Sequence, residues 1–244
     1  MLREAHVTFG GTELPHKSLN AFGPTTIVAP HPDDETLACG GLIALLHRNK
    51  QPVSIVVVSD GGNSHPNSKE FTREAFISMR KIEVMTAVQE LGVTPADVQF
   101  LDYPDGKVAS DPVSAFPAIV KHVSSVLETL NPSTLIIPFR GDSNADHTAT
   151  WHIVRSAVRQ MKRAPRILEY PVWIGPLTEA ICDELAPTVW KLDIASVLGR
   201  KQRAVLAHRS QLGEMQSENG NFTLPPDLLS VFVRGYEGFF EFRD

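Results

Sequence analysis

The stretch TTIVAPHPDDETLACGGLIALLHRNK, residues 25–50, decides how this chain is expected to fold. It begins with a short apolar run rich in β-branched residues, which is typical of a buried strand. A polar turn with one His and three acids follows, and the longer apolar segment 40–50 has helical character. The stretch therefore predicts a strand, a polar turn and a helix, the first part of a βαβ unit.

The same alternation continues along the chain. Three further apolar runs, 53–59, 98–102 and 134–139, are each followed by a longer amphipathic segment. Strands that helices cover on both faces are apolar throughout, as these runs are. We therefore expect an α/β fold with a Rossmann-like, doubly wound and mostly parallel sheet. The expected helices are 40–50, 72–93, 114–130 and 146–163.

The last third of the chain is less regular. Residues 166–173 and 187–194 are typical of further strands, and 196–211 is typical of a helix. The tail, rich in Gly, Phe and Pro, has no assignable pattern. Because no repeat, low-complexity tract or linker marks a boundary, the sequence predicts a single α/β domain over residues 1–244.

Composition excludes several classes of partner. The 244 residues are 42% hydrophobic, enough for a sizeable core, and 23 Lys and Arg against 28 acids give a net charge of −5. This balance gives no electrostatic reason to expect a nucleic acid or an anionic membrane as partner. No apolar run is long enough to span a membrane, and residues 1–11 lack the apolar core of a signal peptide, so we expect a cytoplasmic protein.

Cysteine usage limits the metal chemistry. Cys39 and Cys182 are the only cysteines, too few for a disulfide framework or a Cys-rich zinc site, and both are expected to be buried thiols. Any metal ion must therefore be held by His and carboxylate side chains.

Polar residues gather where each of the four predicted strands ends. In open parallel sheets, ligands bind in the crevice beyond the carboxyl ends of the strands, so these segments are expected to converge. They are residues 31–35, 59–62, 102–106 and 140–147.

His31, Asp34 and His147 are the candidate metal ligands in these segments. Two imidazoles and one carboxylate suit zinc in a catalytic site that keeps one position open for water. A cation would also offset the repulsion among the neighbouring acids. Asp33 is next to a ligand but is not needed as one, so it can take a proton from water.

The alternative is a solvated turn whose acids cap a helix beginning near Thr36 and interact with its dipole. Capping explains one or two acids. It explains neither His31 at a strand end nor the second acid–His pair, Asp146 and His147. Position alone leaves both interpretations open.

The chain resembles the PIG-L/LmbE-like zinc-dependent N-deacetylases, the N-acetylglucosaminyl deacetylases. The family signature is an Ala-His-Pro-Asp-Asp-Glu run after the first strand, and this chain has APHPDDE at residues 29–35, with Pro30 inserted. The second half of the signature is an Asp-His pair after the fourth strand, which is similar to Asp146 and His147 here.

Other segments extend the resemblance. Arg80 and Glu83 match the family's Arg-x-x-Glu helix, LDYPDG at residues 101–106 matches its third strand end, and LAHRSQ at residues 206–211 matches its late helix. The resemblance therefore covers about residues 25–211.

The resemblance implies roles for the residues that match. His31, Asp34 and His147 would bind zinc, and Asp33 would act as the catalytic base. Some relatives have a His three positions before the second metal-binding His, where this chain has Asn144. Asn can donate a hydrogen bond to the substrate but cannot shuttle a proton, so Asp33 would have to pass its proton on.

Arg80 and Asp105 are the candidate contacts for sugar hydroxyls, by resemblance and by position near strand ends. Arg80 could equally form a helix-surface ion pair with Glu83, three residues later. Asp105 and Asp60, each followed by Gly, could equally be turn residues.

The other His residues carry no expected role. His65 is expected on a mobile surface loop, and His208 lies in a segment that could approach the pocket. Three others are expected within helices as surface or packing residues: His47, His122 and His152.

The resemblance, together with these residues, implies a hydrolase that removes an N-acetyl group from an N-acetylglucosamine-type sugar or small glycoconjugate, giving acetate and a free amine. The expected cofactor is Zn²⁺, although the ligand set also tolerates another divalent ion. The partner is a small N-acetylated sugar, with no nucleic acid, and a homo-oligomer is left open. Which sugar it is depends on loops such as 61–70 and 103–112.

Two other functions compete. A nucleotide-binding oxidoreductase is disfavoured because the loop after the first strand lacks G-x-G-x-x-G and carries acids that would repel a pyrophosphate. A non-catalytic module that binds a sugar or a metal stays open on sequence alone.

Overall fold

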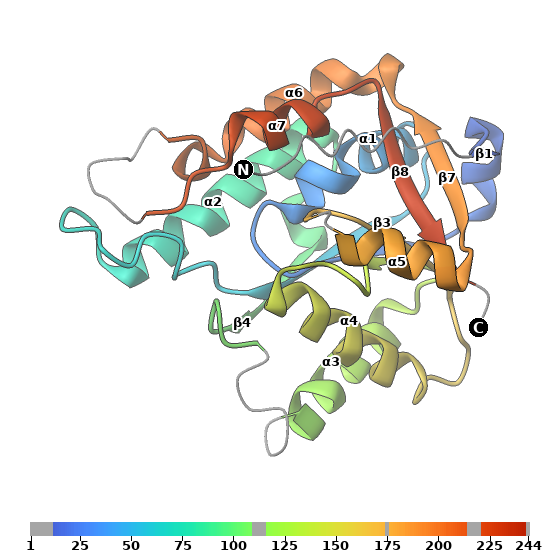
Figure 1. Ribbon diagram of the computed structural model, residues 1–244, viewed down its shortest axis with the longest axis horizontal. Helices are drawn as coiled ribbons and strands as arrows, with labels where there is room; N and C mark the ends of the chain where they lie inside the picture. Colours follow the sequence, from blue (N-terminus) through green and yellow to red (C-terminus); the bar gives the residue numbers. More distant parts are fainter. Residues whose placement is uncertain (1–11, 109–115, 174–175, 214–220, 243–244) are drawn as a thin grey trace.

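One sheet organises the molecule, a computed structural model that describes residues 12–108, 116–173, 176–213 and 221–242 (Figure 1). It has eight strands in the order β1-β7-β8-β6-β5-β2-β3-β4 within this described part. Neighbouring strands are parallel except where β8 pairs with β6 and β7. The predicted α/β fold with a mostly parallel sheet is confirmed. The strands are β1 (Thr12–Glu13), β2 (Thr25–Ala29), β3 (Val53–Ser59), β4 (Val98–Tyr103), β5 (Thr134–Pro138), β6 (Arg166–Tyr170), β7 (Thr188–Asp193) and β8 (Tyr236–Glu241).

Helices cover both faces of this sheet. Helices α1, α2 and α6 lie on one face, and α3 and α4 lie on the other (Figure 1). The helices are α1 (Asp34–Arg48), α2 (Arg73–Leu91), α3 (Phe116–Leu130), α4 (Ala145–Val158), α5 (Pro176–Leu185), α6 (Leu198–Ala207) and α7 (Pro226–Phe232). Short 3₁₀ helices are η1 (His16–Ala21), η2 (Pro95–Asp97), η3 (Ala195–Val197) and η4 (Arg209–Gln211).

The central strand β2 shows why the apolar runs are continuous. All five of its residues are buried. Ile27 and Ala29 pack in the cluster that contains α1, whereas Val28 packs in the cluster that contains α3 and α4. Side chains of a strand alternate between faces, so a strand covered on both sides must be apolar at every position.

The predicted strands agree closely with the structure up to β5, but the helix bounds differ. Helix α1 begins at Asp34, before the expected start at residue 40, and α4 ends at Val158, before the expected end at residue 163. The four predicted strands match β2, β3, β4 and β5 to within one residue at each end. Helix α2 begins after Thr72, whose hydroxyl accepts the Ala75 N–H at 3.2 Å, and ends at Gly92, which has a φ of 96°. Residues 114–115 of the third predicted helix lie outside the described residues.

The order of the strands places a crevice beside β2. From β2 the chain proceeds to β3 and β4 on one side, then crosses to β5 and β6 on the other. Helix α1 follows β2 on one face, and α4 follows β5 on the opposite face. The loops after β2 and β5 therefore diverge, which creates the topological switch point where ligands of open α/β sheets bind.

The C-terminal third departs from the sequence expectations. The predicted helix 196–211 is divided into η3, α6 and η4. The backbone leaves the helical region at Val197, with a φ of −125°, and again at His208, with a ψ of 53°. The unassigned tail contains α7 and β8, and β8 inserts between β6 and β7. The sequence does not predict β8 as a strand because Gly238 and two acids interrupt its apolar residues.

The two cysteines differ in burial. Cys39 lies fully buried in α1, as predicted, but Cys182 is partly exposed because α5 opens to solvent towards its C-terminal end. Among the described residues, no helix combines the length and apolar character that a membrane crossing requires.

Candidate functional site

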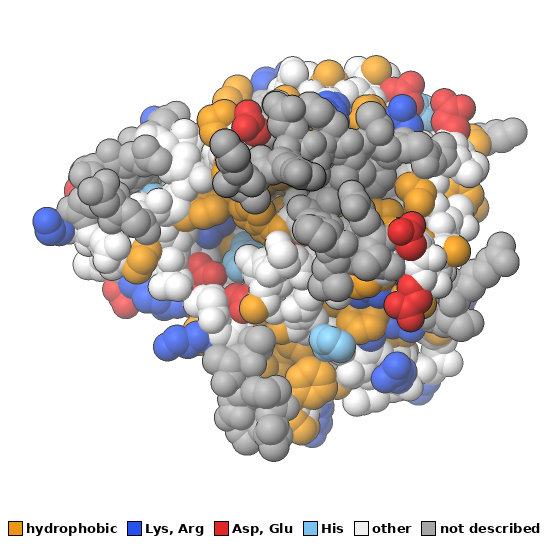
Figure 2. Space-filling model, viewed as in Figure 1, with side chains coloured by type: hydrophobic (Ala, Val, Ile, Leu, Met, Phe, Trp, Pro, Cys, Tyr) orange, Lys and Arg blue, Asp and Glu red, His pale blue; other side chains and the backbone are white. Residues whose placement is uncertain are grey.

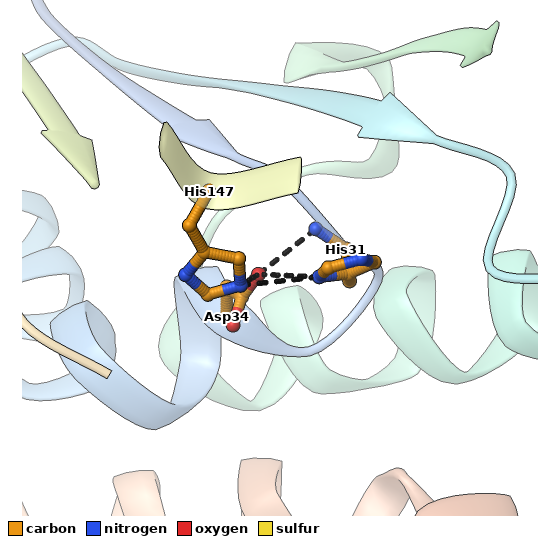
Figure 3. Close-up of side chains that lie close together, drawn as sticks. All are labelled: His31, Asp34 and His147. Atoms are coloured by element: carbon orange, nitrogen blue, oxygen red, sulfur yellow. Dashed lines mark hydrogen bonds and ion pairs between the residues drawn. The ribbon is translucent and has the colours of Figure 1, made fainter. Parts of the chain in front are cut away.

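Three side chains from the two sides of the switch point meet in the crevice. His31 follows β2, Asp34 is the first residue of α1, and His147 lies in the first turn of α4. The three point toward one another (Figure 3). His31 Nδ1 is 3.2 Å from His147 Nε2 and 3.4 Å from Asp34 Oδ2, and His147 Nε2 is 3.3 Å from Asp34 Oδ2.

These separations fit a tetrahedral metal ion. Ligand atoms at bond lengths of about 2.0–2.1 Å around a tetrahedral zinc lie about 3.3–3.4 Å apart. The three measured edges are 3.2, 3.3 and 3.4 Å. The triangle therefore has the size that one such ion requires, and its fourth corner can remain open.

The remaining ring nitrogens of both histidines face carboxylates. His147 Nδ1 is 3.1 Å from Asp142 Oδ2, and His31 Nε2 is 3.3 Å from Asp105 Oδ1 and 3.4 Å from Asp146 Oδ2. An ionised carboxylate only accepts hydrogen bonds, so these nitrogens carry the ring protons. In the neutral rings that a metal ion requires, the nitrogens that face each other then present lone pairs, as in metal-ligating histidines.

Backbone contacts hold these carboxylates in place. Asp142 accepts the N–H groups of Asn144 at 2.9 Å and Trp173 at 3.0 Å, and Asp146 accepts those of Gly106 at 2.7 Å and Val108 at 3.2 Å. Sequence reasoning gave neither acid a role of its own. The available signal was their position in the polar segment after β5, which also contains His147.

Asp33 stands at the N-cap of α1, yet its side chain makes no capping hydrogen bond. Its Oδ2 accepts instead from Arg80 Nη2 at 3.0 Å. Asp34 Oδ2 accepts the His31 N–H at 2.9 Å, and only Glu35 reaches back to a helix-start amide, the Asp33 N–H at 3.1 Å. Capping therefore explains one of the three acids and leaves Asp33 and Asp34 directed elsewhere.

Arg80 is not part of a helix-surface ion pair. It is 3% exposed, and besides Asp33 its guanidinium donates to Pro32 O at 2.8 Å and Gly61 O at 3.2 Å. Gly61 has a φ of +66°, and a Cβ there would lie 2.8 Å from Arg80 Nη1, so this approach needs Gly. The alternative pairing with Glu83 is wrong, because α2 turns Arg80 into the loop after β2.

The charged groups of the cluster have pKa values that are shifted in different directions. Burial raises the pKa of Asp33 to about 7, although Arg80 acts in the opposite direction. Burial alone would raise the pKa of Asp34 too, but His147 and His31 hold it below its usual value. Burial would lower the pKa of His147, but Asp34 and Asp142 raise it to about 9. Likewise, against the effect of burial, Asp105, Asp146 and Asp34 raise the pKa of His31 well above its ordinary value. The site therefore favours positive charge where the two histidines meet.

A pocket of about 180 Å³ opens over these residues. Figure 2 shows a hollow on this face where acidic, basic and histidine side chains gather beside hydrophobic ones. The polar lining is His31, Asp33, Asp34, Asn63, Ser64, Arg80, Asp105, Asn144 and Gln211. The apolar lining is Leu37, Val172, Trp173, Phe222 and Leu224.

The candidate substrate contacts Asp105 and Asn144 are both in this lining. Asp105 Oδ2 accepts the Asn63 N–H at 2.9 Å. Asn144 is the N-cap of α4, and its Oδ1 accepts the Asp146 N–H at 2.8 Å. This bond orients the amide group, so Nδ2 is the Asn144 atom left to donate.

Asp60 and two histidines also have defined surroundings. Asp60 accepts the N–H groups of Gly62 at 2.9 Å and Asp105 at 3.2 Å and pairs with Arg73 at 2.6 Å, so it organises the turn.

His65 is not a mobile surface residue: it is 5% exposed because its ring stacks on Phe76 at 4.5 Å. His208 is 2% exposed, and its Nε2 lies 3.1 Å from Thr36 Oγ1 in the first turn of α1.

Comparison with known proteins assigns the family. The family profile described as PIG-L: GlcNAc-PI de-N-acetylase matches residues 26–158, and the chain belongs to this family. One relative is a Bacillus cereus protein named probable N-acetyl-α-D-glucosaminyl L-malate deacetylase 2. It is 31% identical over 193 residues, which cover 78% of this chain and 84% of that protein.

Two solved structures share the fold at lower identity. The N,N′-diacetylchitobiose deacetylase of Pyrococcus horikoshii matches with a TM-score of 0.68 and 19% identity, over 93% of this chain and 86% of its own. The 4-carboxy-2-hydroxymuconate hydratase of Pseudomonas putida matches with a TM-score of 0.60 and 20% identity, over 86% and 82%. Because a hydratase shares this architecture, the fold alone does not decide the reaction.

Proposed function

We propose that this protein is a zinc-dependent hydrolase that removes the acetyl group from an N-acetylglucosamine-type sugar or small glycoconjugate. The observation that carries the proposal is the triangle of His31, Asp34 and His147, with Asp33 beside it in the pocket. Membership of the PIG-L family and the names of the relatives support the same reaction.

The metal ligands in this proposal are His31 Nδ1, His147 Nε2 and a carboxylate oxygen of Asp34. Zinc held there would act as a Lewis acid on the amide carbonyl and lower the pKa of water from ~15.7 to about 7. Another divalent ion remains compatible with the same ligands.

Asp33 is the proposed general base and acid. Its carboxylate accepts a proton from the attacking water while the new C–O bond forms at the acetyl carbon. When the C–N bond breaks, Asp33 returns this proton to the leaving nitrogen, so that acetate and a free amine are released. Arg80 donates to the Asp33 carboxylate at 3.0 Å and fixes its orientation.

Asn144 is proposed to bind the substrate where some relatives have a His. Its Nδ2 would donate a hydrogen bond to the amide carbonyl oxygen, which gains negative charge during attack. It cannot carry a proton, and for this reason the proposal gives both proton transfers to Asp33.

Of the two residues expected to contact sugar hydroxyls, Asp105 keeps that role and Arg80 does not. Asp105 lines the pocket and keeps lone pairs that can accept from sugar hydroxyls. Arg80 uses Nη1 and Nη2 for Gly61, Pro32 and Asp33, so we infer that it acts through Asp33 more than on the sugar. The cytoplasmic location stays a prediction of the sequence, which makes none about the oligomeric state.

Acetate release tests the proposal directly. Purified protein is stripped with a chelator, reloaded with Zn²⁺ or other divalent ions, and incubated with a panel of N-acetylated amino sugars and their glycosides. We expect acetate and free amine in equal amounts, only after metal is restored. Metal binding without acetate release from any member would favour the binding-module alternative, and NAD(P) binding would favour the oxidoreductase.

A further inference from the structure

Gln211 is a buried pocket residue to which no role has been given above. It lies at the end of η4, is 1% exposed and lines the same pocket as Asp33 and Arg80. Its Oε1 is buried and has no hydrogen-bond partner in the described part of the chain. Buried amide oxygens nearly always have a partner, so this atom indicates a missing ligand or water.

Neighbouring contacts decide which end of the Gln211 amide is free. Ser210 donates its N–H to Glu83 Oε1 and its hydroxyl to Glu83 Oε2, both at 2.7 Å. With its proton given to Glu83, Ser210 Oγ accepts from Gln211 Nε2 at 2.8 Å. The NH₂ group is therefore engaged, and Oε1 is left as an acceptor.

The backbone around Gln211 is also fixed. Gln211 O accepts the Leu224 N–H at 2.8 Å, and the Phe222 N–H bonds to Ser64 O at 2.8 Å. Leu224, Phe222 and Ser64 all line the pocket. Gln211 is thus held in the pocket wall from both its main chain and its side chain, which is the rigid support that a recognition residue needs.

A neutral acceptor in this position suits a hydroxyl donor. We propose that Gln211 Oε1 accepts a hydrogen bond from a ring hydroxyl of the sugar and so helps to determine which sugars bind. Ser210 and Glu83 act through Gln211 as positioning residues. This inference rests on the proposed sugar deacetylase function and adds a recognition contact to it.

The test pairs one substitution with substrates that lack single hydroxyls. The wild type and Gln211→Met are compared on N-acetylglucosamine, or on whichever panel member releases acetate, and on its 3-deoxy, 4-deoxy and 6-deoxy analogues. Met has similar length but lacks the acceptor. We expect kcat/KM on the parent sugar to fall about 10- to 100-fold, mainly through KM, with zinc content unchanged. The deoxy analogue that lacks the hydroxyl contacted by Gln211 should be a poorer substrate than the parent sugar for the wild type. Gln211→Met should not lower kcat/KM for that analogue any further.

Two further variants separate recognition from structure. Gln202→Met changes an exposed Gln on α6 and should leave every kinetic constant unchanged. Ser210→Ala should weaken discrimination among the analogues on its own but add nothing in the Gln211→Met background, because it acts through the same contact.

The outcomes distinguish this inference from the proposed function. Equal losses for Gln211→Met on all analogues, or no loss on any, overturn the role of Gln211 while the deacetylase stands. A wild type that neither releases acetate from any sugar of the panel nor binds one by calorimetry overturns both.

Discussion

Asp33 and Asp34 are neighbours in sequence but lie in opposite electrostatic environments. The two histidines keep the pKa of Asp34 low, whereas burial raises the pKa of Asp33 to about 7. When the pKa values of two adjacent carboxyl groups differ in this way, one group is suited to stay ionised and the other to exchange a proton near neutral pH. The proposed division between a metal ligand and a base rests on the geometry of the site, and this difference in pKa agrees with it.

Replacing Asp33 by Asn tests that division. The amide retains the shape of the side chain but cannot accept the proton, so we expect kcat to fall by ~10²- to 10⁴-fold. Zinc stoichiometry should remain that of the wild type, because Asp33 is not among the three proposed ligands. Turnover within a few-fold of wild type, at full zinc content, would remove Asp33 from the base role.

Asp142 should control metal affinity without touching the metal. Its Oδ2 is 3.1 Å from His147 Nδ1 and fixes the ring proton on that side. In Asp142→Asn the ring loses a charged acceptor, and we expect zinc affinity to fall by about 10- to 100-fold. Competition with a chromophoric chelator measures this, and an unchanged affinity would mean that the tautomer of His147 is set by another group.

The sequence could identify the ligand candidates but not the groups that orient them. His31, Asp34 and His147 belong to short local patterns that follow predicted strands. The contact between Arg80 and Asp33 depends on how α2 packs against the loop after β2, and periodicity carries no such information. The burial of His65 likewise depends on its stacking with Phe76, a tertiary contact.

At the scale of elements, β8 fixes the middle of helix α1. Glu237 on β8 accepts the N–H groups of Gly41 at 2.6 Å and Leu42 at 2.8 Å, and pairs with Lys201 of α6 at 2.6 Å. The side chains of Glu237 and Lys201 are 2% and 1% exposed. Glu237 therefore joins β8 to the helix that carries Asp34 through two backbone hydrogen bonds, and joins β8 to α6 through one buried ion pair.

Lys201→Met should destabilise the protein strongly. It leaves the Glu237 carboxylate buried without its cation, and breaking a buried pair in this way costs about 3–5 kcal/mol of unfolding free energy. Urea denaturation measures the change. The control is Arg203→Met on the same helix, whose pair with Glu90 is solvent-exposed and should contribute less than about 1 kcal/mol. Similar small losses for both variants would contradict the role given to the buried pair.

His208 should make the docking of α6 on α1 sensitive to acid. Burial, with a smaller effect of Arg80, lowers the pKa of His208 from 6.5 to about 3. Between these values the unfolded chain binds a proton that the folded chain excludes, so stability falls as the pH is lowered below about 6.5. At pH 5 the penalty is about 2 kcal/mol relative to pH 7.5.

His208→Gln removes this titration but can still donate to Thr36. We expect the variant to lose about 2 kcal/mol less than the wild type between pH 7.5 and pH 5, because other titrating groups are common to both. Urea denaturation at the two pH values gives the difference. Parallel losses in the two proteins would show that His208 is protonated in the folded state.

At the scale of the whole molecule, the parallel part of the sheet was predictable and the C-terminal strand was not. The runs that became β2, β3 and β5 are apolar at nearly every position, since helices cover both faces. Strand β4 lies at the edge of the sheet, and its Gln99 and Asp102 are exposed. Strand β8 carries Glu237 and Glu241, whose partners Lys201 and Arg166 come from distant parts of the chain. Only the folded arrangement explains acids in that strand.

The fold, in turn, assembles the site from segments far apart in sequence. His31 and His147 are separated by 116 residues, yet their ring centroids lie 5.1 Å apart because β2 and β5 are neighbours in the sheet. Both segments are therefore needed to bring together the three ligands of the proposed metal centre.

Zinc stoichiometry, combined with the X-ray absorption spectrum of the bound metal, tests the central claim most directly. For the wild type we predict one zinc ion per chain, with two imidazole nitrogens and carboxylate or water oxygens as ligands at about 2.0–2.2 Å. The paired variant His31→Ala/His147→Ala should retain its fold by circular dichroism and lose the ion. A folded double variant that binds zinc as the wild type does, or a wild type whose zinc has no imidazole ligand, would contradict the account.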